Sequence, residues 1–173
     1  MPTRRQFIKV GLGGAALFAT VRFLDGPIAA PASPYRLLDE KSASFVKVLA
    51  PVVLAGALPE DAAARDRAVN DIAVSFDRAA SGLAPSAQQE ITDLFGFLDF
   101  APTRLAFAGL WSPIGQSSAE ELRAFLTRWR NSRFELQQAS YQALTQLIQA
   151  SWYDTPAAWA AISYPGPPPI ATK

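Results

Sequence analysis

The chain has 173 residues with a formal net charge of +1, and half of its residues are hydrophobic, enough for one domain with a sizeable core. It contains no cysteine and no histidine, which excludes disulfides, thiolate nucleophiles and covalent haem attachment, together with imidazole bases and the usual zinc and copper ligands. We therefore expect no catalytic, cofactor-binding or metal site in this chain; a carboxylate-only metal site stays open, but the sequence has no dense acidic cluster.

Residues 1–32 have the pattern of a twin-arginine signal peptide. The first nine residues, MPTRRQFIK, place Arg4 and Arg5 ahead of Phe7 and Lys9, and a short apolar run at 10–21 follows. Charged, apolar and cleavage regions in this order are typical of export signals. We therefore predict export to the periplasm through the twin-arginine translocase. The alternative is an ordinary N-terminal amphipathic or core helix.

The leader also contains a cleavage site. Ala30 and Ala32 form a small-x-small pattern, which predicts cutting after Ala32 because cutting after Ala30 would place Pro31 beside the scissile bond. A spanning helix needs roughly 20 apolar residues, and the apolar run is shorter and is followed by Arg22. Membrane contact is therefore expected only through the leader, with retention of the leader as an inner-membrane tether left open.

The rest of the chain, residues 33–173, is slightly acidic. Four of the 16 basic residues and one of the 15 acidic residues lie in the leader, so the remainder has a net charge of −2. Nothing in this balance indicates a nucleic-acid-binding surface.

The first half of this region predicts three helices after an extended entry at 33–38. Asp39 suits the cap of a helix reaching Val53, and Pro51 should kink or end it. A second helix should begin near Asp61 and close at 81–82, and its core stripe is predicted to be Val69, Ile72, Phe76, Ala79 and Leu83. Ser86, followed by Glu90, should open a third helix.

The second half predicts three further helices, preceded by a segment that is a turn or a short helix. That segment, at 104–110, should follow the break at Pro102, and 111–115 should form a loop. Residues 117–121, SSAEE, resemble a capping box for a helix through Trp129. A long helical pattern runs from 134 to 152, with a bend or an exposed face at 131–132, and a short helix starts at 154–156. Without sustained period-two alternation, these patterns predict an all-α fold, a compact bundle of five or six helices followed by a proline-rich C-terminal tail.

Two polar groups admit a functional or a structural interpretation. The basic group consists of Arg123, Arg128, Arg130 and Arg133. Charge runs of this kind usually lie on a solvated face, here paired with Glu120, Glu121 and Glu135, and the alternative is docking to an acidic partner. Asp93 and Asp99 are the carboxylates near an aromatic-rich stretch, and without a partner base we expect both to be solvated.

The tryptophans divide between core and surface. Trp129 falls on an apolar stripe and is expected in the core, whereas Trp152 and Trp159 lie beside a polar, proline-rich tail. For these two we keep both core and partner-contact interpretations, because aromatic residues are enriched at partner contacts. The segment from Tyr164 to Pro169 is either a plain chain end or a polyproline ridge for a partner.

Taken together, these features resemble a known family, the gluconate 2-dehydrogenase subunit 3-like proteins. These are small subunits, carrying a twin-arginine leader, of membrane-associated flavin dehydrogenases. The resemblance lies in the leader motif TRRQFIK, in the pair Trp152 and Tyr153, and in the C-terminal Tyr164, Pro165 and Gly166.

The resemblance implies a non-catalytic accessory subunit that binds, stabilises and exports a large catalytic subunit. That partner would be an FAD-dependent alcohol or sugar dehydrogenase of the glucose-methanol-choline (GMC) type, so FAD is expected in the partner and no cofactor in this chain. A cytochrome c subunit is a further partner in the family. The expected docking residues are Trp152, Tyr153, Trp159, Tyr164, Pro165 and Gly166. The alternative is a stand-alone periplasmic helical protein that binds a small apolar ligand or lipid between its helices.

Overall fold

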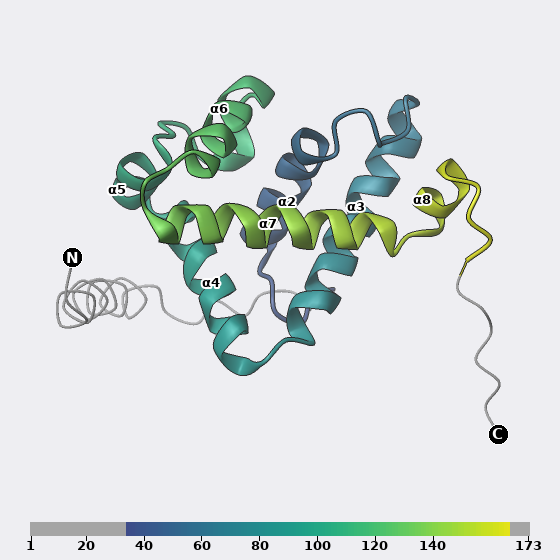
Figure 1. The fold of residues 1–173 in the computed structure, drawn as a ribbon, viewed down its shortest axis with the longest axis horizontal. Coiled ribbons are helices and arrows are strands. Elements are labelled where there is room, and N and C mark those ends of the chain that lie inside the picture. The colour runs from purple at the N-terminus through teal and green to yellow at the C-terminus, as the bar shows by residue number, and fades with distance from the viewer. Residues whose placement is uncertain (1–33, 167–173) are drawn as a thin grey trace. The chain divides into compact units, whose positions relative to one another are not determined.

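The computed structural model describes residues 34–166, whose regular structure is entirely helical (Figure 1). Five helices of 12 to 20 residues form the body: α2 (Glu40–Val53), α3 (Ala62–Ser81), α4 (Pro85–Asp99), α6 (Ala119–Arg130) and α7 (Glu135–Tyr153). The shorter elements are α5 (Ala101–Thr103), the π-helix η1 (Arg104–Ala108), the 3-10 turn η2 (Ile114–Gln116) and α8 (Pro156–Ala161). The all-α prediction is confirmed. The predicted leader, with Arg4, Arg5, Phe7, Lys9, Ala30 and Ala32, lies outside the described residues.

Helix α7 organises the bundle. It packs against α2, α3 and α6, and α8 follows at its C-terminal end (Figure 1). Helix α2 in turn contacts α3, α6 and η2, while α4 lies against α3 and η1. The core therefore sits between α2, α3, α4 and α7, and the end of α4, α5, η1 and the start of α7 gather at one end of the bundle (Figure 1).

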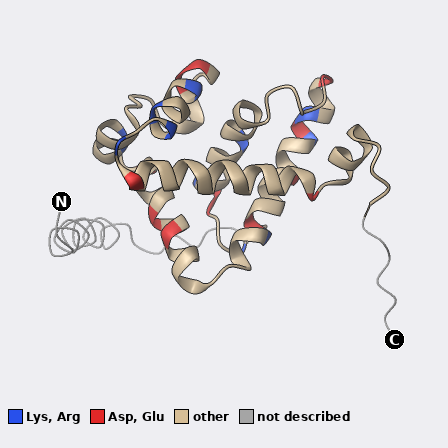
Figure 2. Ribbon diagram, in the orientation of Figure 1, with Lys and Arg blue, Asp and Glu red and all other residues tan. Residues whose placement is uncertain are grey.

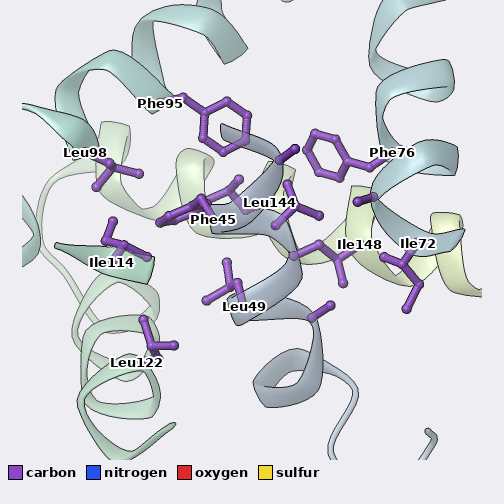
Figure 3. Packing of buried hydrophobic residues seen from close by; sticks show 14 of the residues in the cluster. Phe45, Leu49, Ile72, Phe76, Phe95, Leu98, Ile114, Leu122, Leu144 and Ile148 are labelled. Carbon is purple, nitrogen blue, oxygen red and sulfur yellow. The ribbon is translucent and has the colours of Figure 1, made fainter. Parts of the chain in front are cut away.

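Aromatic and aliphatic side chains fill this core (Figure 3). Phe45 of α2 meets Phe95 of α4 edge to face, with ring centroids 5.4 Å apart, and Phe76 of α3 lies 6.1 Å from Phe95. Leu144 and Ile148 of α7 belong to the same cluster. Burying one such side chain stabilises the folded state by about 1.5–3 kcal/mol. Since the cluster buries many of them, it is the main stabilising contact among the helices.

The predicted cap at Asp39 and the predicted capping box within residues 117–121 are confirmed, and the predicted helix start near Asp61 coincides with a cap at that residue. Asp39 Oδ1 accepts a hydrogen bond from the Ser42 N–H at 2.7 Å, and Asp61 caps α3 in the same way. The capping box of α6 is complete: the Glu121 N–H donates to Ser118 Oγ, and the Ser118 N–H donates to Glu121 Oε2 at 2.8 Å. The backbone hydrogen bond from Ser118, with help from its side chain, lowers the pKa of Glu121 below its usual value.

Two local predictions are wrong. Helix α4 begins at Pro85 rather than through a cap at Ser86, because proline has no N–H to satisfy and its φ suits the first turn. Ala79 of α3 is exposed, as is Leu83, which lies beyond the end of the helix, and the buried apolar face of α3 consists of Ala68, Ile72, Ala73, Phe76 and Ala80. Small residues let the packed helices approach closely, so this face is rotated from the one that the largest side chains predict.

The connections also differ in detail from the predictions. Residues 111–115 are not wholly irregular, since Ile114 starts the 3-10 turn η2 and is buried. The chain bends at residues 131–132, because α6 ends at Arg130 and α7 begins at Glu135. Pro51 lies inside α2, which ends two residues later at Val53.

One buried carboxylate ties the entry segment to the bundle. Asp77 of α3 is 4% exposed and accepts three backbone hydrogen bonds, from the N–H groups of Arg36 (2.7 Å), Leu37 (2.8 Å) and Leu38 (2.8 Å). Residues 36–38 are thus attached to α3, the helix that packs against α7, at a position some 40 residues further along the chain. Their hydrogen bonds satisfy a buried charge that would otherwise be costly.

Candidate docking surfaces

The C-terminal docking residues expected from the sequence divide between core and surface. Trp152 is 2% exposed and packs in the core, so it offers no surface to a partner. Tyr153 and Tyr164 are about half exposed, at 54% and 45%, and Trp159 is partly buried. We call Tyr153, Trp159, Tyr164, Pro165 and Gly166 the C-terminal aromatic cluster.

This cluster is held in place by specific contacts. The indole Nε1 of Trp159 donates to the Tyr153 carbonyl at 2.7 Å, and the Tyr164 N–H donates to the Trp159 carbonyl at 2.8 Å. The Tyr164 ring meets the Trp159 ring edge to face, at 6.2 Å between centroids. A Cβ on Gly166 would lie 3.4 Å from the indole ring, and its φ of +96° suits glycine. The chain after α8 therefore folds back over Trp159.

A second set of exposed apolar side chains was not predicted and belongs to segments at the other end of α7. The set consists of large side chains that are 38% to 81% exposed: Phe97, Phe100, Leu105, Phe107, Trp111 and Phe134. We call it the α4–η1 surface. The sequence signal was the aromatic-rich stretch at 97–111, whose members do not follow one helical stripe.

The π-helix η1 at the centre of this surface is fixed by its neighbours. The Phe107 carbonyl accepts hydrogen bonds from Trp129 Nε1 at 3.0 Å and from Gln137 Nε2 at 2.9 Å. The rings of Phe97 and Phe107 stack, with centroids 6.4 Å apart. Helices α4, α6 and α7 thus all hold η1, and π-helical segments of this kind occur frequently at functional sites.

The end of η1 depends on a glycine. Gly109 has φ +61°, a left-handed conformation that costs other residues about 1–2 kcal/mol. Arg128 Nη1 donates to the Ala108 carbonyl at 2.9 Å, and a Cβ on Gly109 would lie 1.6 Å from that nitrogen. Both the backbone conformation and the arginine contact therefore require glycine here.

Arg104 lies buried beneath the same surface. Its Nη1 donates to the Asp99 carbonyl at 2.8 Å and so satisfies the C-terminal end of α4. Its Nε is buried and has no hydrogen-bond partner within residues 34–166. Such an orphaned donor is costly.

The arginines of α6 and the following bend lack the predicted acidic partners. Within the described part of the chain, the ion pairs are Lys41–Asp99 and Arg78–Asp154, so the expected pairing with glutamates is wrong. The Arg133 guanidinium instead lies 5.1 Å from the centroid of the Phe134 ring. In Figure 2, blue segments of the ribbon mark the basic positions along α6.

The two aspartates of α4 have surface partners, in keeping with solvated positions. Asp93 accepts a hydrogen bond from Gln89 at 2.8 Å, while Asp99 binds Lys41 at 3.1 Å. They do not share a hydrogen bond with each other.

A hollow of about 150 Å³ lies between α2, α6 and α7. Its lining includes Val52, Leu126, Arg130 and Tyr141. Ligand sites for small molecules usually measure about 300–1,000 Å³, so this hollow is small for such a role.

Across residues 34–166, no group of three or more acidic side chains is placed to hold a metal ion, and no helix there is long and apolar enough to cross a membrane. In comparisons with known proteins, no family model, no curated protein and no solved structure matches this chain.

Proposed function

We propose that this chain is a non-catalytic accessory subunit that binds and stabilises a catalytic subunit and escorts it through twin-arginine export. The catalytic subunit is an FAD-dependent alcohol or sugar dehydrogenase of the GMC type. The observation that carries the proposal is the C-terminal aromatic cluster, in which Tyr153 and Tyr164 are about half exposed while the Tyr164 ring packs on Trp159. A partner can cover them with little loss of conformational entropy, because Trp159 and Tyr164 are already held by hydrogen bonds.

The composition of the cluster supports contact with a protein. Tyrosine and tryptophan are enriched at interfaces, since each buries a large apolar ring and keeps a polar group for a hydrogen bond. The proline-rich residues 165–169 follow at once in the sequence. Proline-rich segments dock readily because little flexibility is lost on binding.

The leader gives a reason for a two-chain arrangement. A flavoprotein loads FAD in the cytoplasm and must cross the membrane already folded. A tightly bound helper with Arg4 and Arg5 in its own signal supplies the export address for both chains. The partner performs the oxidation and holds the FAD, a cytochrome c subunit accepts the electrons, and this chain contributes binding and export. Its location is the periplasm, with membrane contact through the leader alone.

The alternative of a stand-alone ligand-binding protein receives less support. It needs a pocket between helices, and the hollow beside Arg130 measures about 150 Å³. The large apolar side chains that such a pocket would use lie instead in the close-packed core or on the exterior.

Affinity purification of the tagged chain from its own host tests the proposal. We expect a second, larger protein in equal amount, identified by mass spectrometry as a flavin dehydrogenase and showing flavin absorbance. A monodisperse chain that carries a bound lipid and no flavoprotein would contradict the proposal and favour the alternative.

The same purification tests the carrying observation. Tyr164→Ala removes the ring that packs on Trp159 and should lower the yield of co-purified flavoprotein. Ile162→Ala is the matched control, because Ile162 is 60% exposed, apolar and adjacent to the cluster but makes no ring contact with it. Equal yields from both variants would remove the cluster as a docking element.

A further inference from the structure

We infer that the α4–η1 surface is a second docking site on this chain, for a folded protein whose facing surface is apolar at its centre and carries carboxylates at its rim. The inference rests on the proposed function, because the exported catalytic subunit is the partner it assigns. It adds a contact at the far end of α7 from the C-terminal aromatic cluster.

The amount of exposed apolar material is the first reason. Five of the six large side chains belong to one stretch, 97–111, and Phe134 joins them through the start of α7. Hydrogen bonds connect the two segments: the Phe107 carbonyl accepts from Gln137 Nε2, and the Gln137 N–H donates to the Phe134 carbonyl. Soluble monomers rarely leave large contiguous apolar patches in water, and such patches commonly mark interaction sites.

The aromatic composition of the surface favours a protein partner. Phe97, Phe107 and Leu105 are about 40% exposed, and the rings of Phe97 and Phe107 stack on each other. Trp111 is the most exposed of the six side chains, at 81%. Tryptophan is enriched among the few residues that dominate the binding energy of protein interfaces, so we assign a protein as the occupant.

Charge identifies what should surround the partner's apolar centre. Arg133 lies over the Phe134 ring, and Arg128 donates to the Ala108 carbonyl at the end of η1. Neither guanidinium has a carboxylate within 4.0 Å in the described part of the chain. Arginine is enriched in protein interfaces, and carboxylates on the partner would complement these two cations.

The surface is also prepared for binding. Hydrogen bonds from Trp129 and Gln137 fix the Phe107 carbonyl, and Gly109 lets Arg128 reach the end of η1. A surface held in one conformation loses little flexibility when a partner covers it, so more of the contact energy appears as affinity.

The test uses the full-length chain, tagged and purified from its own host with its partner. Trp111→Ala should lower the affinity of the complex at least tenfold, as expected for a central tryptophan, and Arg133→Glu should slow association and weaken its dependence on salt. Leu83→Ala is the matched control: Leu83 is 39% exposed at the turn between α3 and α4, outside the surface, and its loss should leave binding unchanged. Circular dichroism and thermal midpoints confirm that each variant is folded.

A photo-crosslinking residue at position 111 provides a second measurement that does not depend on affinity. We expect crosslinks to the flavoprotein at an apolar surface flanked by aspartate or glutamate, and no such crosslinks from position 83. If Trp111→Ala and Arg133→Glu retain the flavoprotein at wild-type yield, the docking site is wrong while the proposed function stands.

Two other outcomes separate the claims. If the crosslinked protein presents the expected apolar and acidic surface but contains no flavin, the docking site stands and the proposed function falls. The third outcome concerns phosphatidylglycerol vesicles. If the wild-type chain binds them and the Trp111→Ala variant does not, while that variant still retains the flavoprotein, then the surface contacts lipid and the inference is overturned.

Discussion

Replacing Asp77 by alanine should release the entry segment from α3 and destabilise the whole bundle. The carboxylate accepts hydrogen bonds from the N–H groups of Arg36, Leu37 and Leu38, at 2.7 to 2.8 Å. Alanine leaves all three donors without an acceptor. Leu38, which is 4% exposed and packs in the core, would also lose its anchor.

The expected cost follows from the burial of these donors. An unsatisfied buried donor costs about 1–3 kcal/mol. The bond to Leu38 is buried, whereas water can partly replace the bonds to Arg36 and Leu37, which are only part-buried. We therefore expect Asp77→Ala to lower the free energy of unfolding by about 3–5 kcal/mol, a large share of the 5–15 kcal/mol typical of a domain.

Urea unfolding followed by circular dichroism measures this loss, and amide hydrogen exchange at residues 36–38 reports the release directly. Asp71→Ala is the control, because Asp71 lies on the same helix at an exposed position. Its effect should stay within about 0.5 kcal/mol. If Asp77→Ala cost no more than this control and left exchange at 36–38 unchanged, the anchoring role of the carboxylate would be refuted.

Two further substitutions test local features of the fold. Gly109→Ala should lower the free energy of unfolding by about 1–2 kcal/mol, from the left-handed backbone and the displacement of Arg128; an unchanged thermal midpoint would count against it. Ser118→Ala should lower the free energy of unfolding by about 1 kcal/mol, because the cap of α6 is lost. The same substitution should raise the pKa of Glu121 toward 4.5, and an NMR titration of Glu121 measures this change. Since the folded pKa of Glu121 is lowered, its contribution is present above pH 4.5 and disappears as the pH falls through that folded pKa. A pKa that ignores the substitution would refute the capping box.

The helix starts that the sequence predicted correctly depend on neighbouring residues. Asp39, Asp61 and Ser118 each bond an N–H three positions along the chain, so a short motif contains the whole interaction. The start of α4 was misplaced because both Pro85 and Ser86 suit a helix N-terminus, and only the backbone decides between them.

Contacts between distant segments were beyond the sequence patterns. The bonds to Asp77 join positions some 40 residues apart. The buried face of α3 was misjudged because periodicity weights large side chains, whereas Ala68, Ala73 and Ala80 lie inward. The α4–η1 surface was missed because its members do not follow one helical stripe, so periodicity gives no signal for them.

The candidate site was partly predicted. Tyr153, Trp159 and Tyr164 belong to a surface cluster, as the aromatic tail suggested, but Trp152 does not, because it completes the core beside Ile148. Sequence leaves core and interface tryptophans indistinguishable, since both roles select the same large apolar ring.

The escort role is tested most directly by replacing Arg4 and Arg5 with lysines in the native host and locating the partner flavoprotein by cell fractionation. We predict that both chains stay in the cytoplasm, folded and still bound to each other, with FAD loaded in the partner. A partner that reaches the periplasm at its normal level while this chain remains behind would contradict the account.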